Sequence, residues 1–231
     1  MKIKASKRFK KLIEISKNKQ KETIEEAIKK VKKNCTSKFD ESIDVSFSLN
    51  LKSKKEEVAL RTLVNLPNGN GKKIRVAVLC EESKIADAKK SGAELYGSET
   101  LINDITSGKI KFDKLISTPA MMIKLSKLGK VLGPKGLMPN PKLGTVTTKI
   151  SEAVKLIKSG QTEIRNDKDG NIGLSIGKKS FSDQNLINNF NSIIDVISKE
   201  KPSNVKGQLI KSAFITSTMG ISYKLKLDKT I

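Results

Sequence analysis

The pattern of apolar residues in the strands changes twice along this chain, and this change constrains its fold more than any other feature. Between Ile43 and Leu51, apolar and polar residues alternate strictly, as in a strand with one buried face. From Ile74 to Cys80 nearly every residue is apolar, as in a strand buried on both faces. Alternating strands return from Gln161 onward. The middle of the chain is therefore predicted to form a different kind of domain from the two ends.

The two ends together predict an α+β domain. Two short basic helices are expected within residues 1–38, where Thr23 and Glu26 have the spacing of a capping box. The other expected elements are strands at 43–51, 60–66, 162–166, 171–176, 209–217 and 221–227, and a helix at 186–197. The sequence Asp167-Lys-Asp-Gly170 is typical of a hairpin turn between two of these strands.

The middle of the chain predicts a small parallel α/β domain. Strands are expected at 74–80, 93–96 and 114–117, and helices at 83–91, at 98–107, from Pro119, and at 151–159. The turn residues of Pro67-Asn-Gly-Asn-Gly71 mark the crossing into this domain. We therefore predict a discontinuous architecture, in which residues 1–67 and 160–231 form one domain and residues 68–159 form an inserted one.

The charge of the chain indicates an anionic partner. Lys and Arg number 46 against 24 Asp and Glu, so the formal net charge is +22. A field of this sign attracts polyanions, nucleic acid before an acidic membrane surface. No apolar run approaches the roughly 20 residues of a membrane span, so no membrane partner is expected. Seven Phe, two Tyr and no Trp are too few to stack successive single-stranded bases, which favours a folded nucleic acid.

Catalysis and metal binding have little support in the sequence. The chain has no His, which excludes Ser-His-Asp and Cys-His nucleophile systems and the commonest zinc sites. Cys35 and Cys80 lie in separate apolar patterns and are expected to be buried thiols of a reducing cytoplasm. The twelfth position from Asp167 is Lys178 rather than Glu, so a calcium loop is not expected. A phosphate-handling enzyme that uses the α/β domain stays as the alternative function.

The segment Lys127–Val146 has the most unusual composition. Its twenty residues hold four Gly, four Lys and three Pro, and no acid. Because Pro lacks an N–H donor and Gly allows close approach of the backbone, we predict an exposed cationic loop that binds an anion. A solvated connection is the alternative. The apolar residues Val131, Leu132, Leu137 and Met138 argue against it and indicate that the loop packs on its own domain.

This segment resembles the signature of the ribosomal protein L one family, of the large subunit. The residues that carry the likeness are Gly129, Gly133, Pro134, Gly136, Pro139, Pro141 and Gly144. Residues 36–41, 71–76, 163–168 and 217–220 resemble further blocks of the family in the right order. The resemblance covers essentially the whole chain, in its bacterial form.

The resemblance implies both a fold and a function. The fold is a split α+β terminal domain with an inserted Rossmann-like three-layer α/β domain, joined through two hinge strands. The function is that of a structural constituent of the large ribosomal subunit, in the cytoplasm, monomeric when free and without catalysis, cofactor or metal. The implied partners are the rRNA of a mobile stalk beside the tRNA exit site, deacylated tRNA whose release it assists, and its own operon mRNA, which it represses.

The resemblance also implies which residues bind RNA. By residue match, the main rRNA contact falls on the terminal domain at Lys38, Phe39, Arg165, Lys168, Ser212, Thr218, Met219 and Gly220. Local patterns alone favour a core position for Phe39 and an ordinary hairpin connection at Thr218–Gly220, and the resemblance overrides both. The chain departs from the family at residues 52–59 and at Asn68, where family members often carry His.

Overall fold

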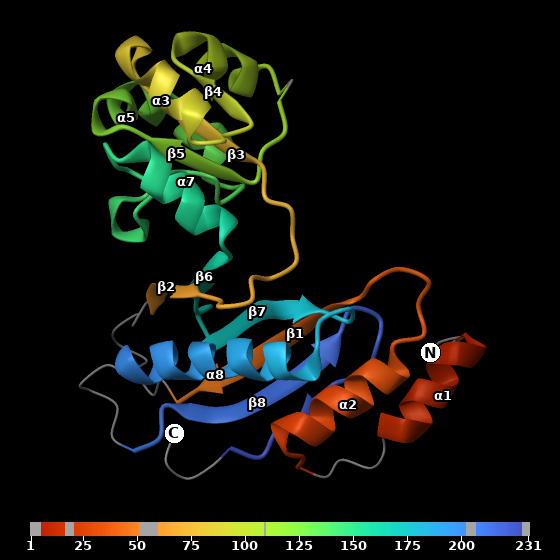
Figure 1. Cartoon of the computed structure of the whole chain (residues 1–231). Coiled ribbons are helices and arrows are strands. Elements are labelled where there is room, and N and C mark those ends of the chain that lie inside the picture. Colours follow the sequence, from red (N-terminus) through yellow and green to blue (C-terminus); the bar gives the residue numbers. More distant parts are fainter. Residues whose placement is uncertain (1–5, 17–20, 51–59, 109, 202–206, 228–231) are drawn as a thin grey trace. The chain divides into compact units, whose positions relative to one another are not determined.

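The computed structural model describes residues 6–16, 21–50, 60–108, 110–201 and 207–227 (Figure 1). The chain forms two compact units: Met1–Gly71 with Glu163–Ile231, and Lys72–Thr162. The first unit therefore combines both ends of the chain. Helices and strands occur in both units, so the fold class is α+β, as the sequence predicts. No helix in the described part of the chain has the length and hydropathy of a membrane span.

The first unit is built on a four-stranded antiparallel sheet with the order β7–β1–β8–β9. The strands are β1 (Ser42–Leu49), β7 (Asn171–Lys178), β8 (Ile210–Ser217) and β9 (Tyr223–Lys224). Strand β1 lies between β7 and β8 and pairs with both along nearly its whole length. A strand from the N-terminal part of the chain thus obtains both of its neighbours from the C-terminal part.

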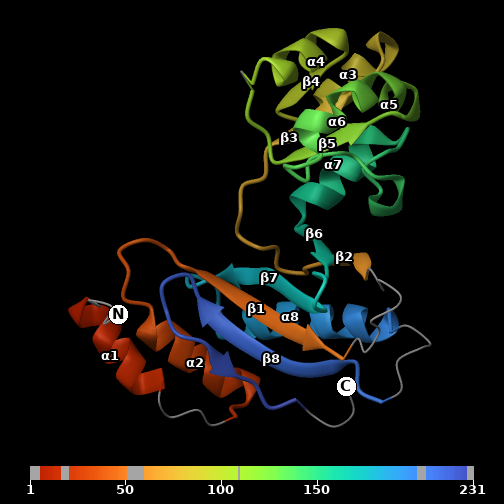
Figure 2. The ribbon, with the colours of Figure 1, turned by 180° about the vertical axis from the view of Figure 1, so that it is seen from behind.

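Two helices cover one face of this sheet, α2 (Ile24–Asn34) and α8 (Asp183–Lys199), as Figures 1 and 2 show. The alternating apolar residues of β1 are buried against them: Ile43, Val45, Phe47 and Leu49. The ring of Phe47 stacks on that of Phe190 in α8, with 5.9 Å between ring centroids. The helix α1 (Lys7–Ser16) buries only Leu12 among its described side chains. The predicted capping box at the start of α2 is present.

The turn Asp167–Gly170 does not join a regular hairpin, contrary to the prediction from sequence. Strand β6 (Gln161–Arg165) pairs with β2 (Arg61–Asn65) in a separate two-stranded sheet, whereas β7 belongs to the four-stranded sheet. A short antiparallel link does form across the turn, through an isolated bridge between Asn166 and Ile172 and the Asp167 N–H, which donates to the Asn171 carbonyl oxygen at 2.9 Å. The turn itself is present, and the chain uses it to pass from one sheet to the other.

Asn189 of α8 holds residues 68–69, where the N-terminal part of the first unit ends. Its side chain is fully buried and donates to the carbonyl oxygens of Gly69 and Ile176, each at 2.8 Å. Its Oδ1 accepts the backbone N–H of Asn68 at 3.1 Å. One buried amide thereby satisfies three backbone groups from two separate segments.

The second unit contains a parallel sheet in the order β4–β3–β5. Its strands are β3 (Val76–Leu79), β4 (Leu95–Gly97) and β5 (Lys114–Ser117). Its longer helices are α3 (Ile85–Lys90), which follows the turn η1 (Glu82–Lys84), α4 (Glu99–Thr106), α5 (Pro119–Leu125) and α7 (Ile150–Lys158). One face of β3 packs on α3 and α7 and the other on α4 and α5. This is the three-layer α/β arrangement that the resemblance implies.

The segment Lys127–Val146 is not the continuous loop that the sequence predicts. The turns η2 (Ser126–Leu128) and α6 (Gly129–Leu132) continue directly from α5, and η3 (Pro141–Leu143) follows. Pro141 occupies the first position of its turn, where the missing N–H has no intrahelical partner to lose. Leu128, Leu132 and Leu143 are buried, so the segment packs on its own unit.

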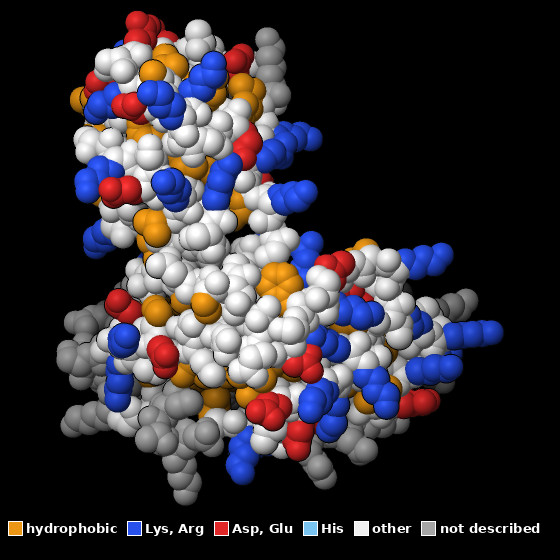
Figure 3. All heavy atoms as spheres, in the orientation of Figure 1, with side chains coloured by type: hydrophobic (Ala, Val, Ile, Leu, Met, Phe, Trp, Pro, Cys, Tyr) orange, Lys and Arg blue, Asp and Glu red, His pale blue; other side chains and the backbone are white. Residues whose placement is uncertain are grey.

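Lys and Arg side chains occur on both units on the face drawn in Figure 3. In the first unit they gather around α1 and α2. In the second unit, the four lysines of the Lys127–Val146 segment are all exposed: Lys127, Lys130, Lys135 and Lys142. The positive charge of the chain is therefore available at the surface of each unit.

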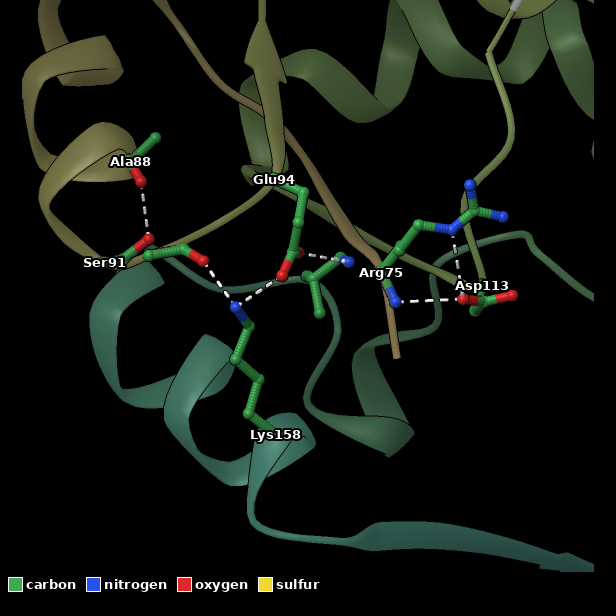
Figure 4. A network of polar contacts seen from close by, with 8 residues as sticks. Arg75, Ala88, Ser91, Glu94, Asp113 and Lys158 are labelled. Atoms are coloured by element: carbon green, nitrogen blue, oxygen red, sulfur yellow. Dashed lines mark hydrogen bonds and ion pairs between the residues drawn. The ribbon is translucent and has the colours of Figure 1, made fainter. Parts of the chain in front are cut away.

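Glu94 joins three parts of the second unit (Figure 4). Its carboxylate accepts the backbone N–H of Val76 at 2.8 Å and Nζ of Lys158 at 2.6 Å. Lys158 Nζ also donates to the Gly92 carbonyl oxygen at 2.6 Å. Burial would raise the pKa of Glu94, but the hydrogen bonds from Lys158 and Val76 outweigh it and hold the pKa below its ordinary value.

Glu94→Gln is expected to destabilise the second unit by about 1 kcal/mol near neutral pH, because the amide cannot form the charged hydrogen bonds. Since folding lowers the pKa of Glu94, its contribution is present above the ordinary value of 4.5 and is lost as the pH falls through the folded pKa. Urea unfolding of both proteins at neutral pH and in acid measures the difference. The control is Glu152→Gln, an exposed acid of α7 with a 3.5 Å contact to Lys149. A difference that does not shrink in acid would contradict the ionic role of Glu94.

Candidate nucleic-acid interface

Two turns meet at one end of the four-stranded sheet, and we call them the turn pair: Thr36–Glu41, which leads into β1, and Thr218–Gly220, which follows β8. They are adjacent because Ile43 pairs with Ser217. The backbone N–H of Thr218 donates to the Ser42 carbonyl oxygen at 3.1 Å, and Ser42 N–H donates to Thr218 Oγ1 at 3.0 Å. Five predicted contact residues belong to the turn pair: Lys38, Phe39, Thr218, Met219 and Gly220.

Phe39 and Met219 hold large apolar side chains in solvent. Their exposed fractions are 53% and 47%. The core position that local pattern favours for Phe39 is therefore wrong, because the turn before β1 directs this residue away from the alternating buried face. Complete burial of such a side chain contributes about 2 kcal/mol of favourable free energy, and a bound partner would bury these two.

Glu41 is fully buried and ties the two turns together. Its Oε1 accepts the Ser37 N–H and its Oε2 accepts the Met219 N–H, each at 3.1 Å. The buried Ser217 hydroxyl also interacts electrostatically with this carboxylate, although its oxygen has no hydrogen-bond partner among the described atoms. Burial would raise the pKa of Glu41, but Ser217 and the N–H groups of Met219 and Ser37 outweigh it and lower the pKa. The carboxylate is therefore charged at neutral pH.

Arg8 of α1 also contacts both turns. Its Nη1 donates to Thr36 Oγ1 at 3.1 Å, and its Nη2 donates to the Met219 carbonyl oxygen at 3.2 Å. Neither Arg8 nor Glu41 was among the residues predicted from sequence. Arg8 is one of several basic residues in an expected basic helix, and Glu41 follows another acid, Asp40, at the entry to a strand, so the sequence singles out neither.

Gly220 has no room for a side chain. A Cβ at this position would collide with Ser217 Oγ. The Gly220 N–H donates to the Ser217 carbonyl oxygen at 3.1 Å, which closes the turn. A bare backbone here allows a ligand to approach the main chain closely.

The other predicted contact residues lie at the opposite end of the sheet. Ser212 pairs with Ser48, which pairs on its other side with Asn171 beside the Lys168 turn. Arg165 and Lys168 are exposed. Six residue steps along β1, from Ser42 to Ser48, span about 20 Å. The structure therefore divides the eight predicted residues into two groups rather than bringing them into one cluster.

The sheet face between the two groups is covered by no described helix (Figure 2). Alternation along the strands places the hydroxyls of Ser46, Ser175 and Thr216 on this face. Gly173 lies beside Ser46, and an added Cβ there would meet no atom within 4 Å. On β8 and β9, Nζ of Lys224 lies 5.8 Å from the centroid of the Phe214 ring. Hydroxyls and a cation are groups that can bind ribose and phosphate.

The described residues offer little for catalysis or metal binding. They contain no group of three or more Cys, Asp or Glu placed to hold a metal ion. Cys35 and Cys80 are buried free thiols, and burial raises the pKa of both. The second unit has a cavity of about 210 Å³ lined by Lys84, Asp87 and residues 148–152. Ligand pockets usually measure roughly 300–1,000 Å³, so this cavity does not favour the nucleotide-handling alternative.

The chain departs from the family resemblance in two places, at residues 52–59 and at Asn68. Residues 52–59 lie outside the described residues. Asn68 is described, and its backbone N–H and side-chain amide bond to Asn189 and to the Asn185 carbonyl oxygen. Asn at position 68 thus takes part in the attachment of this segment to α8.

Comparison with known proteins gives concordant matches. The model of a family described as the ribosomal protein L1p/L10e family matches residues 31–221. The large ribosomal subunit protein uL1 of Pelagibacter ubique (strain HTCC1062) is 61% identical over 227 residues, which cover 98% of this chain and 99% of the relative. Proteins of the same name from Prochlorococcus marinus (strain NATL1A) and Rickettsia africae (strain ESF-5) are 48% and 45% identical. These matches cover 88% and 87% of this chain and 87% and 84% of the relatives.

Proposed function

Because this chain belongs to the ribosomal protein L1p/L10e family, we propose that its first unit binds the rRNA of a mobile stalk of the large ribosomal subunit. The chain is a structural constituent of that subunit, a ribosome component in the cytoplasm, and not an enzyme. The finer proposal concerns which RNA it binds and by which residues.

The observation that carries this proposal is the turn pair. It presents two large exposed apolar side chains, Phe39 and Met219. The buried carboxylate of Glu41 holds the backbone of both turns through hydrogen bonds. A flexible thioether and an aromatic ring can lie against bases and riboses, and Gly220 leaves the backbone accessible beside them. Lys38 in the same turn adds attraction for phosphate.

The second group of predicted residues extends the same interface. Lys168 and Arg165 would contact phosphates at the far end of the sheet, and Ser212 would bond to ribose or phosphate oxygens. The open hydroxyl-bearing face runs between the two groups. This spacing supports binding of a folded RNA by its shape, rather than of one extended strand by stacked bases.

Two further partners belong to the proposal. Deacylated tRNA would meet the exposed lysines of the Lys127–Val146 segment as it leaves the ribosome, and the protein would assist its release. A segment of the protein's own operon mRNA that imitates the rRNA site would bind the turn pair, and binding would repress translation. We propose that the free protein is a monomer.

A salt series tests the RNA proposal. Affinity for a stalk rRNA fragment and for an unrelated RNA duplex of equal length is measured from roughly 50 to 300 mM salt. Both affinities fall with salt because the lysines and arginines of the protein release counterions from the RNA when it binds. The stalk fragment is nevertheless expected to bind more tightly than the duplex at every salt concentration. Equal affinities throughout would refute a specific site. A saturable thermal shift of the protein with a nucleotide would favour the phosphate-handling enzyme instead.

A further inference from the structure

Ionised side chains hold both backbone groups of Met219. Oε2 of Glu41 accepts its N–H at 3.1 Å, and Nη2 of Arg8 donates to its carbonyl oxygen at 3.2 Å. Each of these side chains also reaches the other turn, Glu41 through the Ser37 N–H and Arg8 through Thr36 Oγ1. Three separate segments of the chain, residues 8, 36–41 and 217–220, are therefore fastened together at one residue of the proposed interface.

Glu41 cannot act by touching RNA. Its side chain is fully buried, and its charge has the same sign as a phosphate. A buried carboxylate is costly unless it accepts hydrogen bonds, and Glu41 uses its oxygens to hold the N–H groups of two turns. Its geometry therefore suits a role that acts through Met219 and the Ser37–Phe39 segment.

Arg8 is committed to protein atoms in a similar way. It is partly buried, and two nitrogens of its planar guanidinium bond to oxygens in different turns. Lys offers a single ammonium on a flexible stem and cannot reproduce this two-armed geometry. The charge of Arg8 and its geometry can thus be separated by substitution.

We propose that Glu41 and Arg8 are positioning residues for RNA recognition, which hold Phe39 and Met219 in the arrangement that binds. The inference rests on the proposed RNA-binding function. A turn pair that is fixed before binding loses less conformational freedom when RNA binds, so affinity is higher than for mobile turns. No contact between either residue and RNA is required.

The Glu41→Gln variant separates an effect of net charge from an effect of positioning, because the two predict opposite changes in RNA affinity. Removing a negative charge strengthens RNA binding if only net charge matters. Loss of positioning weakens it, and we expect at least about tenfold weaker binding of the stalk fragment, with the unrelated duplex bound as before or slightly more tightly. The matched control is Asp195→Asn, which removes the same charge from an exposed position of α8 outside the turn pair. This variant should not lose affinity.

The Arg8→Lys variant tests the other partner with its charge kept. Its affinity for the stalk fragment should fall about fivefold or more, while the slope of log affinity against log salt stays as in the wild type. The control is Lys11→Gln in the same helix, an exposed residue whose loss should lower the affinity for both RNAs alike. Amide hydrogen exchange in the free proteins should become faster at residues 36–39 and 217–220 in both Glu41→Gln and Arg8→Lys.

The outcomes separate the inference from the function on which it rests. A wild type that binds both RNAs equally would overturn the proposed function and the inference with it. A wild type that binds specifically, together with variants at Glu41 and Arg8 that bind the stalk fragment as tightly, would overturn the inference alone. If Glu41→Gln fails to fold, the decision rests on Arg8→Lys, because Arg8 lies outside the core.

Discussion

Met219→Asp is expected to weaken binding of the stalk rRNA fragment about 100-fold, which corresponds to roughly 2.8 kcal/mol. The substitution removes an exposed thioether from the centre of the turn pair and places a carboxylate where we propose that RNA lies. The free energy of unfolding should change by less than about 0.5 kcal/mol, because the side chain is 47% exposed and the N–H and carbonyl of residue 219 keep their partners. Filter binding at fixed salt and urea unfolding measure the two quantities.

The matched control for this prediction is Ile123→Asp in the second unit. Ile123 is an apolar residue of α5 with an exposed fraction of 80%, so the substitution adds the same charge on the surface of the other unit. It is expected to lower the affinity for both RNAs slightly through net charge. A Met219→Asp protein that is strongly destabilised but binds RNA normally when folded would show that Met219 has a packing role instead.

Asn189→Leu is expected to destabilise the first unit by roughly 3–5 kcal/mol. Leu has the same branched arrangement of side-chain heavy atoms as Asn but cannot form hydrogen bonds, so three backbone groups lose their partner. These are the carbonyls of Gly69 and Ile176 and the N–H of Asn68. Leaving buried polar groups unpaired costs more than the hydrogen bonds contribute in the folded protein. Urea unfolding followed by circular dichroism measures the loss.

Asn191→Leu is the control for Asn189→Leu. Asn191 lies two residues further along α8 and is exposed, so its replacement should change the free energy of unfolding by less than about 0.5 kcal/mol. Hydrogen exchange should show faster opening at residues 68–69 in Asn189→Leu alone. Equal stability of the two variants would mean that water satisfies the backbone groups when the amide is absent.

The elements that the sequence predicted well are those whose own residues determine their burial. Strict alternation in β1 and the apolar run in β3 correspond to one and two buried faces. The errors arise where distant residues decide. The Asp167–Gly170 turn looks like a hairpin locally, but β6 pairs with β2 and β7 with β1. The helical turns η2 and α6 form because α5 continues through Gly129, which local glycine and proline content alone argued against.

The candidate site divides in the same way. The family resemblance named residues that are exposed in the turn pair, and local pattern alone would have placed Phe39 in the core. The roles of Glu41 and Arg8 depend on three segments meeting in space, with Arg8 and Met219 separated by 211 positions in sequence. No periodicity or spacing within one segment reports such a contact. The separation of Lys168 and Ser212 from the turn pair likewise follows from strand register.

The position of β1 between β7 and β8 has a consequence for synthesis of the protein. During translation Ser42–Leu49 leaves the ribosome early, but both of its partner strands lie beyond residue 170. At about 5–20 residues per second, β1 waits on the order of 10–30 s before β8 is complete. The second unit is contiguous in sequence and can fold during this interval. We therefore expect the nascent chain to acquire its proposed RNA-binding surface last, so that an interrupted chain exposes an unpaired strand but cannot compete for rRNA.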